Sequence, residues 1–227
     1  MTRRLLILSV FLIPLQAGAQ TGNSAGPEKW ESSISAFETR DAASPPPTEA
    51  LLFVGSSSIR MWDLKRSWPD KSTINNGFGG STLADSIHHF DRLFTPYSPG
   101  AIVLYAGDND IKKGLNAPEV ARDFETLASL IQSAFPEVPV IYIAIKPSIA
   151  RRELWPEMKQ ANDLIAALCN EQKYWFFADI SAPMLKDGKE VPPAKWFIKD
   201  GLHLSAFGYQ KWTSVVNGIL EKAMPGE

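Results

Sequence analysis

Short runs of consecutive apolar residues recur along the chain and predict the strands of a sheet. They lie at 50–54, 101–105, 138–145 and 174–178, of which 101–105 and 138–145 are the strongest. Thr73-Ile74-Asn75, with a single apolar residue, is a weaker strand candidate. Consecutive apolar positions are typical of a strand that is buried on both faces, as in a parallel sheet covered by helices.

Between these runs, apolar residues recur at the three- and four-residue spacing of amphipathic helices. The stripes comprise Trp30, Ile34 and Phe37; Leu83, Ile87, Phe90 and Phe94; Val120, Phe124, Leu127 and Ile131; Leu154, Met158, Ala161, Ile165 and Leu168; and Tyr209, Trp212, Val216 and Ile219. Pro118 fits a first helical turn, and Ser205 is a predicted N-cap. Strands that alternate with helices predict parallel crossovers and an α/β fold with helices on both faces of an open sheet.

The first residues follow the pattern of a cleavable secretory signal. Arg3 and Arg4 precede the apolar run 5–15, and Ala17-Gly18-Ala19 provides a small-residue cleavage site. The run is too short to span a bilayer, which makes the alternative of an uncleaved membrane anchor the weaker one. We therefore expect residues 1–19 to be removed, 20–49 to form a leader and an N-terminal helix, and 50–224 to form the main domain. The mature protein is expected to be exported, either periplasmic or secreted, without stable membrane insertion.

The composition excludes several classes of protein and several kinds of site. The 227 residues are 44% hydrophobic and carry a net charge of −2, which excludes a disordered chain and a nucleic-acid binder driven by bulk charge. Cys169 is the only cysteine in the sequence, so no intramolecular disulfide is possible. Three histidines leave little for an all-histidine zinc site, and the sequence has no P-loop. We therefore expect neither a metal nor a cofactor.

Chemistry-bearing residues follow the predicted strands, at the sheet edge where open α/β proteins bind their ligands. These segments are Gly55-Ser56-Ser57-Ser58, the glycine-rich turn Asn75–Thr82, Gly107-Asp108-Asn109-Asp110 and, before the last helix, Asp200-Gly201-Leu202-His203. A serine activated by His203, with Asp200 orienting the imidazole, can attack an ester. A glycine-turn N–H and the Asn109 amide can stabilise the oxyanion.

Each segment also has a plain structural interpretation. The serine cluster can be a turn and helix cap, and the glycines can be ordinary turn residues. The pair His88-His89 lies off the apolar stripe of its predicted helix, which favours a solvated helix face. The long segment 181–199 is rich in Pro, Lys and Trp and is a candidate lid or pocket wall.

In this order, the four segments resemble the sequence blocks of the SGNH (GDSL-like) hydrolases, over roughly 50–224. The resemblance implies a three-layer α/β/α, flavodoxin-like sandwich with a five-stranded parallel sheet. It also implies Ser57 as the nucleophile, His203 as the base and Asp200 as its partner. The oxyanion donors would be the backbone N–H groups of Ser57 and Gly80 and the side chain of Asn109, with no metal.

The chain departs from the family pattern at one position. Ser56 stands where the family has an Asp, so three serines occur in a row and Ser58 is an alternative nucleophile. Gly79 is likewise an alternative to Gly80. The family Asp is not the carboxylate that pairs with the histidine, so the mechanism does not depend on it.

These observations predict an exported serine esterase or acylhydrolase that forms an acyl-enzyme on Ser57. Its substrate is expected to be a short-chain or carbohydrate-borne acyl ester, with Arg60, Phe78, Lys146 and Arg151 as candidate contacts. The alternative is a non-catalytic envelope module that binds glycans through exposed aromatic residues, for which Trp62, Trp155, Trp175 and Trp196 are the candidates.

Overall fold

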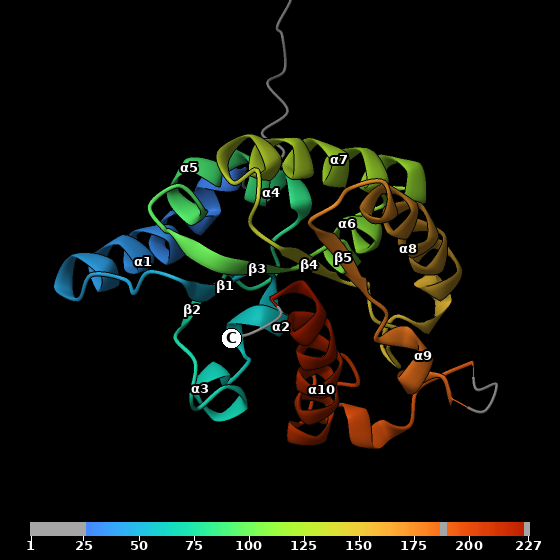
Figure 1. Cartoon of the computed structure of the whole chain (residues 1–227). Coiled ribbons are helices and arrows are strands. Elements are labelled where there is room, and N and C mark those ends of the chain that lie inside the picture. Colours follow the sequence, from blue (N-terminus) through green and yellow to red (C-terminus); the bar gives the residue numbers. More distant parts are fainter. Residues whose placement is uncertain (1–25, 187–189, 225–227) are drawn as a thin grey trace, which may run out of the picture.

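The computed structural model describes residues 26–186 and 190–224, in which five strands form one parallel sheet (Figure 1). The strands are β1 (Ala50–Gly55), β2 (Thr73–Gly77), β3 (Pro99–Tyr105), β4 (Val140–Ile143) and β5 (Trp175–Ala178). Their order across the sheet is β2-β1-β3-β4-β5, and all neighbouring pairs are parallel. The predicted five-stranded parallel sheet is therefore confirmed.

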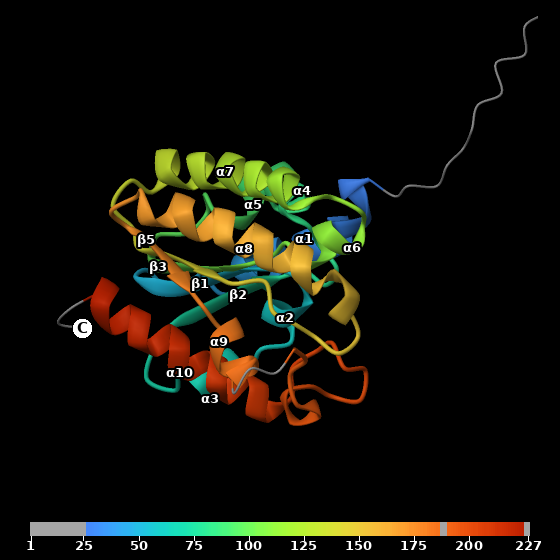
Figure 2. The same ribbon diagram turned by 90° about the vertical axis from the view of Figure 1, so that its right-hand side faces the viewer.

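Helices cover both faces of the sheet (Figures 1 and 2). One face carries α1 (Glu31–Ala43), α4 (Leu83–His88), α5 (Phe90–Leu93), α6 (Asp108–Lys112), α7 (Ala117–Ala134) and α8 (Trp155–Asn170). The other carries α2 (Ser57–Arg60), α3 (Leu64–Ser67), α9 (Ser181–Met184) and α10 (Ala206–Ala223). Short 3-10 turns occupy Pro27–Trp30, Arg152–Leu154 and Ala194–Trp196. This arrangement is the predicted three-layer α/β/α sandwich.

The sheet separates two hydrophobic clusters. Side chains alternate along β1, so that Leu52 and Val54 join the cluster under α7 and α8, while Leu51 and Phe53 join the cluster under α10. Every residue of β1 is buried, because helices cover it on both sides. The continuous apolar runs of the sequence are a direct consequence of this double burial.

The strand β4 ends earlier than the apolar run 138–145 predicts. Its last residue is Ile143, and the backbone N–H and C=O of Ile145 bond instead to the side chain of Asn162 on α8, at 2.7 and 2.9 Å. The amide of Asn162 replaces a neighbouring strand as hydrogen-bond partner. The chain can therefore leave the sheet without losing these backbone hydrogen bonds.

The apolar stripe at 83–94 predicts one helix, but the structure has two short helices that meet at His89. His89 is buried, and its Nε2 lies 3.1 Å from the carbonyl oxygen of Pro27. The expectation of a solvated His88-His89 pair is therefore wrong for His89, although His88 is exposed. The break lets the imidazole reach the segment that precedes α1.

The glycan-binding alternative loses most of its candidate surface. Trp62, Trp175 and Trp196 are 3%, 6% and 4% exposed, and Trp155 is half-buried. Trp62 packs against the rings of Trp68, Tyr209 and Trp212, with centroid distances of 5.3, 5.4 and 5.7 Å. Trp62, Trp68 and Trp212 are buried between α10 and the sheet, and Tyr209 is half-buried beside them.

The predicted signal at residues 1–19 lies outside the described part of the chain, as do residues 187–189 of the predicted lid. Within the described residues, no helix is long and apolar enough to cross a membrane. Those same residues contain no group of three or more His, Cys, Asp or Glu side chains arranged to hold a metal ion.

Candidate active site

The predicted site residues converge at the carboxyl edge of the sheet. Ser57 follows β1 and Asn109 follows β3, which are neighbours in the sheet. From β1 the chain continues to β2 on one side of this pair, and from β3 it continues to β4 on the other side. Such a switch point is where open parallel sheets form ligand sites. Gly80 follows β2, and His203 precedes α10. The side chains of Ser57, Asn109 and His203 line one cleft together with Gly80.

Ser57, His203 and Asp200 form a hydrogen-bonded chain. Nε2 of His203 lies 3.0 Å from Oγ of Ser57, and its Nδ1 lies 2.5 Å from Oδ2 of Asp200. The other carboxylate oxygen of Asp200 accepts the backbone N–H groups of Leu202 and His203, both at 2.9 Å. The partial burial of Asp200 acts to raise its pKa, but the hydrogen bond with His203 and the backbone donors lower it to about 2. Asp200 is therefore ionised at neutral pH and holds the imidazole ring.

The three consecutive serines have different environments. Oγ of Ser57 faces the cleft, whereas Ser58 is buried with its Oγ 3.2 Å from Nζ of Lys146. Ser56 is also buried, and its hydroxyl has no hydrogen-bond partner among the described residues. Of the three, Ser57 is the one bonded to His203.

A strained glycine brings the serine loop close to β3. Gly55 has a φ of 146°, and a Cβ at this position would lie 2.0 Å from the carbonyl oxygen of Tyr105. Only glycine fits such an approach. The same carbonyl oxygen accepts the N–H of Ser56 at 3.0 Å, which fixes the start of α2 against the sheet.

The predicted oxyanion donors lie around the same cleft. Gly80 has a φ of 82°, a left-handed conformation that favours glycine. The neighbouring Gly79 does not have a positive φ. Nδ2 of Asn109 donates to the carbonyl oxygen of Ser81 at 2.9 Å, which uses one of its two hydrogens. Its Oδ1 accepts a hydrogen bond from Arg151 at 3.0 Å. These two bonds fix the orientation of the amide and leave one N–H available.

A buried charge network lies beneath the nucleophile loop. Nζ of Lys146 contacts Ser58, Tyr105 and Asp108 at 3.2, 2.9 and 3.2 Å, so all three of its hydrogens have acceptors. Nη1 of Arg151 lies 3.1 Å from Oδ2 of the same Asp108. Burial acts to raise the pKa of Asp108, but the two cations hold it below its ordinary value. The network thus ties the serine loop, the Asn109 loop and the segment after β4 together.

Asp110 has a structural role that the sequence does not reveal. Its carboxylate accepts the N–H of Leu83 at 2.9 Å and that of Gly107 at 3.1 Å. The Asn109 loop is thereby attached to the start of α4. The signal was present in the sequence, because Asp110 immediately follows Asn109, but nothing there indicates its partners.

The candidate substrate contacts have separate positions. Arg60 and Arg151 line the cleft, whereas Lys146 and Phe78 are buried and do not. Trp30 lines the cleft too, and its ring packs edge-on against Phe78 with 5.8 Å between centroids. In the sequence, Trp30 belongs to an apolar helix stripe, and nothing there indicates a site residue.

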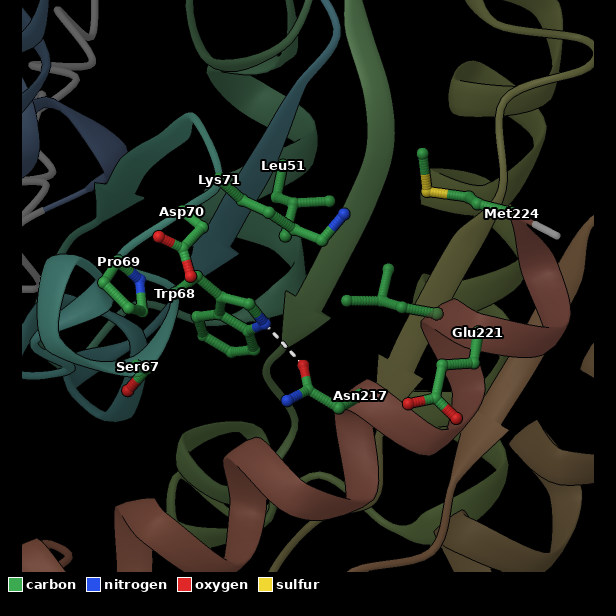
Figure 3. A pocket seen from close by; sticks show the side chains of 10 residues that line it. Leu51, Ser67, Trp68, Pro69, Asp70, Lys71, Asn217, Glu221 and Met224 are labelled. Carbon is green, nitrogen blue, oxygen red and sulfur yellow. Dashed lines mark hydrogen bonds between the residues drawn. The ribbon is translucent and has the colours of Figure 1, made fainter. Parts of the chain in front are cut away.

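The cleft has a volume of about 450 Å³ and is open to solvent. It is lined by Trp30, Ser33, Ser57, Arg60, Gly79, Gly80, Asn109, Arg151, Leu202 and His203. A second hollow lies at the opposite end of the strands, between the segment after α3 and the end of α10 (Figure 3). There Trp68 donates to Asn217, and none of the predicted site residues is present.

Comparison with known proteins defines the class. A family model of enzymes that hydrolyse ester bonds matches residues 56–211, well over half of the chain. The protein is therefore an ester-bond hydrolase. It belongs to the GDSL-like lipase/acylhydrolase family, which confirms the resemblance to the SGNH hydrolases.

Individual relatives are distant. An arylesterase of Vibrio mimicus is 20% identical over 176 residues, which cover 69% of this chain and 80% of that protein. A GDSL-like lipase structure from Bacteroides thetaiotaomicron has a TM-score of 0.68 and 22% identity, covering 84% of this chain and 98% of that one. A family 3 carbohydrate esterase from Clostridium thermocellum has a TM-score of 0.62 and 20% identity, covering 79% and 100%. At such identities the structures establish the fold alone.

Proposed function

We propose that the protein is an exported serine esterase that cleaves carboxylic esters through an acyl-enzyme on Ser57. The observation that carries this proposal is the hydrogen-bonded chain from Ser57 through His203 to Asp200, which opens onto the cleft. Membership of an acylhydrolase family is consistent with it. The roles of the individual residues follow from their chemistry.

In the first half of the reaction, Oγ of Ser57 attacks the ester carbonyl while Nε2 of His203 takes the hydroxyl proton. The negative charge moves to the carbonyl oxygen, which accepts hydrogen bonds from the backbone N–H groups of Ser57 and Gly80 and from Nδ2 of Asn109. When the tetrahedral intermediate collapses, His203 gives its proton to the departing alcohol oxygen. Asp200 stabilises the imidazolium throughout and remains ionised.

In the second half, water attacks the acyl-enzyme carbonyl as His203 takes one of its protons. Collapse of this second intermediate returns the proton to Oγ of Ser57 and releases the carboxylic acid. No metal or cofactor takes part in either step.

The proposed substrate is a small ester with a short acyl chain, or one carried on a carbohydrate. The open cleft with Trp30 at its wall is compatible with a sugar ring stacked on the indole. A carbohydrate esterase among the structural neighbours is in keeping with this proposal.

Export is proposed from the basic start and short apolar run of residues 1–19. Expression of the full chain in a bacterial host, followed by cell fractionation and intact mass measurement, tests it. We expect a mature protein that begins at Gln20 and lies outside the cytoplasm. A full-length product in the cytoplasm would contradict the proposal.

Two reagents test the esterase mechanism. We expect turnover of para-nitrophenyl acetate, and covalent labelling of the peptide that carries Ser57 by a fluorophosphonate, which loses fluoride as the serine oxygen attacks phosphorus. Ser57→Ala is expected to abolish labelling and Ser58→Ala to retain it. Labelling that survives Ser57→Ala but not Ser58→Ala would assign the nucleophile to the neighbouring serine instead.

A further inference from the structure

The cleft carries two arginines with different electrostatic surroundings. The guanidinium of Arg151 is 3.1 Å from Asp108, also donates to its backbone carbonyl, and has a side chain only 13% exposed. Arg60 is exposed and lines the same cleft. Its side chain has no hydrogen bond or ion pair with any residue in 26–186 or 190–224. Arg151 is therefore paired with a carboxylate of the protein, which it shares with Lys146, whereas Arg60 is not paired.

The position of Arg60 relative to the nucleophile is set by the fold. It ends α2, three residues after Ser57, and side chains at this spacing lie on the same side of a helix, about 5–6 Å apart at Cβ. Its guanidinium lies over the glycine turn, since a Cβ on Gly79 would come within 2.7 Å of Nε of Arg60. The charge is thus held beside Gly80, at the rim of the proposed oxyanion site.

No acidic side chain in the described structure lines the cleft. Asp108 and Asp200, which pair with lining residues of the cleft, are already engaged, Asp108 by Lys146 and Arg151 and Asp200 by His203. The cleft is therefore cationic, although the whole chain carries a net charge of −2. A positively charged cleft in a chain of negative net charge favours an anionic group of the ligand.

We propose that Arg60 selects esters that carry a carboxylate close to the scissile bond. The inference rests on the esterase function proposed above and names the substrate class of the same site. A planar guanidinium matches the two oxygens of a carboxylate and can donate two parallel hydrogen bonds to it. The carboxylate can belong to the acyl group or to the alcohol, as in a uronic acid, and both cases share the same recognition chemistry.

Two matched substrate pairs separate these cases. On the acyl side, mono-para-nitrophenyl adipate is compared with para-nitrophenyl hexanoate. On the alcohol side, para-acetoxybenzoate is compared with its methyl ester. For each pair, the measured quantity is the ratio of kcat/KM for the anionic ester to kcat/KM for the neutral ester, in the wild type and in Arg60→Gln.

In Arg60→Gln we expect this ratio to fall on the order of tenfold for at least one pair, because a charge-assisted hydrogen bond is lost. Arg60→Lys keeps the positive charge but lacks the planar guanidinium with its two parallel donors. It is expected to retain part of the preference for the anionic ester. Higher ionic strength is expected to reduce the preference of the wild type but not that of Arg60→Gln. Arg66→Gln, an equal change of charge at an exposed residue of α3 outside the cleft, serves as the control.

The outcomes distinguish the two proposals. If the wild type hydrolyses the neutral esters and neither ratio changes in Arg60→Gln, the carboxylate inference is wrong and the esterase proposal stands. If Arg66→Gln lowers the ratio as much as Arg60→Gln, the effect is one of net charge and the inference is also wrong. If the wild type hydrolyses none of the four esters, both proposals are overturned.

Discussion

The orientation of the Asn109 side chain is set by the residues that contact it. The amide of Asn109 is oriented by an acceptor on one side, the carbonyl of Ser81, and a donor on the other, Arg151. Arg151 is held in turn by Asp108. The direction of the free N–H of Asn109 therefore depends on a chain of contacts that reaches well below the cleft.

Replacement of Asn109 by alanine tests how much its N–H donor contributes to kcat. Because the donor is proposed to act on the oxyanion and not on the ground-state ester, kcat is expected to fall by about 10²–10³ with little change in KM. Arg151→Met is expected to give a smaller fall in kcat, since the amide remains but loses its orientation. Steady-state kinetics with para-nitrophenyl acetate measure both. A kcat within twofold of wild type for Asn109→Ala would remove this residue from the proposed oxyanion site.

Asp110 is expected to make the stability of the fold depend on pH. Burial raises its pKa to about 7, although two backbone N–H groups bond to the carboxylate and act in the opposite direction. The pKa of an aspartate in an unfolded chain is about 4. Because the folded state has the higher pKa, its stabilisation is fully present below about pH 4 and is lost as the pH rises towards 7.

The variant Asp110→Asn lacks this titration. We expect the free energy of unfolding of the wild type, measured relative to the variant, to decrease as the pH rises from about 4 to about 7. Urea denaturation at a series of pH values measures it. Asp70→Asn, at an exposed position between α3 and β2, is the control variant. Parallel stability curves for the wild type and Asp110→Asn would contradict the raised pKa.

Among the elements, the turn after β2 places a backbone donor beside the serine loop. Gly80 has the left-handed φ of 82°, and an added Cβ would lie 3.3 Å from the ring of Trp30. At Gly79, which does not require a left-handed φ, the added atom would meet the flexible end of Arg60. The same substitution therefore strains the backbone at one glycine and moves only a side chain at the other.

We expect Gly80→Ala to lower kcat about tenfold or more, because the strained turn displaces the proposed oxyanion donor. Gly79→Ala is expected to cost less in kcat with a neutral ester. Kinetics with para-nitrophenyl acetate, together with melting temperatures of both variants, separate a local effect from unfolding. Equal losses in the two variants would argue that Gly80 has no special role.

Sequence patterns predict a strand well where all of its residues are buried. They predict the end of an element poorly where a distant side chain takes the place of a backbone hydrogen-bond partner. The strands β1 and β3 follow from their apolar runs, since a double-sided sheet leaves no polar position. The end of β4 could not be predicted, because it depends on Asn162 from a distant helix. At the break, His89 contacts Pro27, which is 62 residues away in sequence.

The site shows the same division. Asn109, Asp200 and His203 could be located from their places after a strand and before the last helix. The same reasoning locates the serine cluster, but the choice of Ser57 within it came from the family resemblance. The positions of Arg151 and Lys146 could not be located in this way, because long side chains reach partners more than thirty residues away in sequence. Trp30 looked like a core residue because its helical spacing is that of an apolar stripe.

In the whole molecule, the first helix behaves as part of the hydrolase domain, although it precedes the family match at residues 56–211. Ile34 of α1 is completely buried in the cluster under α7. Arg40 donates to the carbonyl oxygen of Asn75 and to the side chain of Asn76, at 2.9 and 3.0 Å. These contacts bind α1 to β2, and the preceding turn carries Trp30 into the cleft.

If α1 is integral to the domain, a cavity in its contact should destabilise the entire fold. Ile34→Ala is expected to lower the free energy of unfolding by about 2–5 kcal/mol, in one cooperative transition. Ser32→Ala, at an exposed position of the same helix, is expected to stay within about 0.5 kcal/mol of wild type. Urea denaturation followed by both tryptophan fluorescence and far-UV circular dichroism measures these values. A small loss for Ile34→Ala, or a separate early transition, would mean instead that α1 unfolds on its own and that residues 20–49 form an appendage to a domain beginning at β1. Trp30 is the N-cap residue of α1 and lines the cleft, so the docking of α1 also positions this side chain.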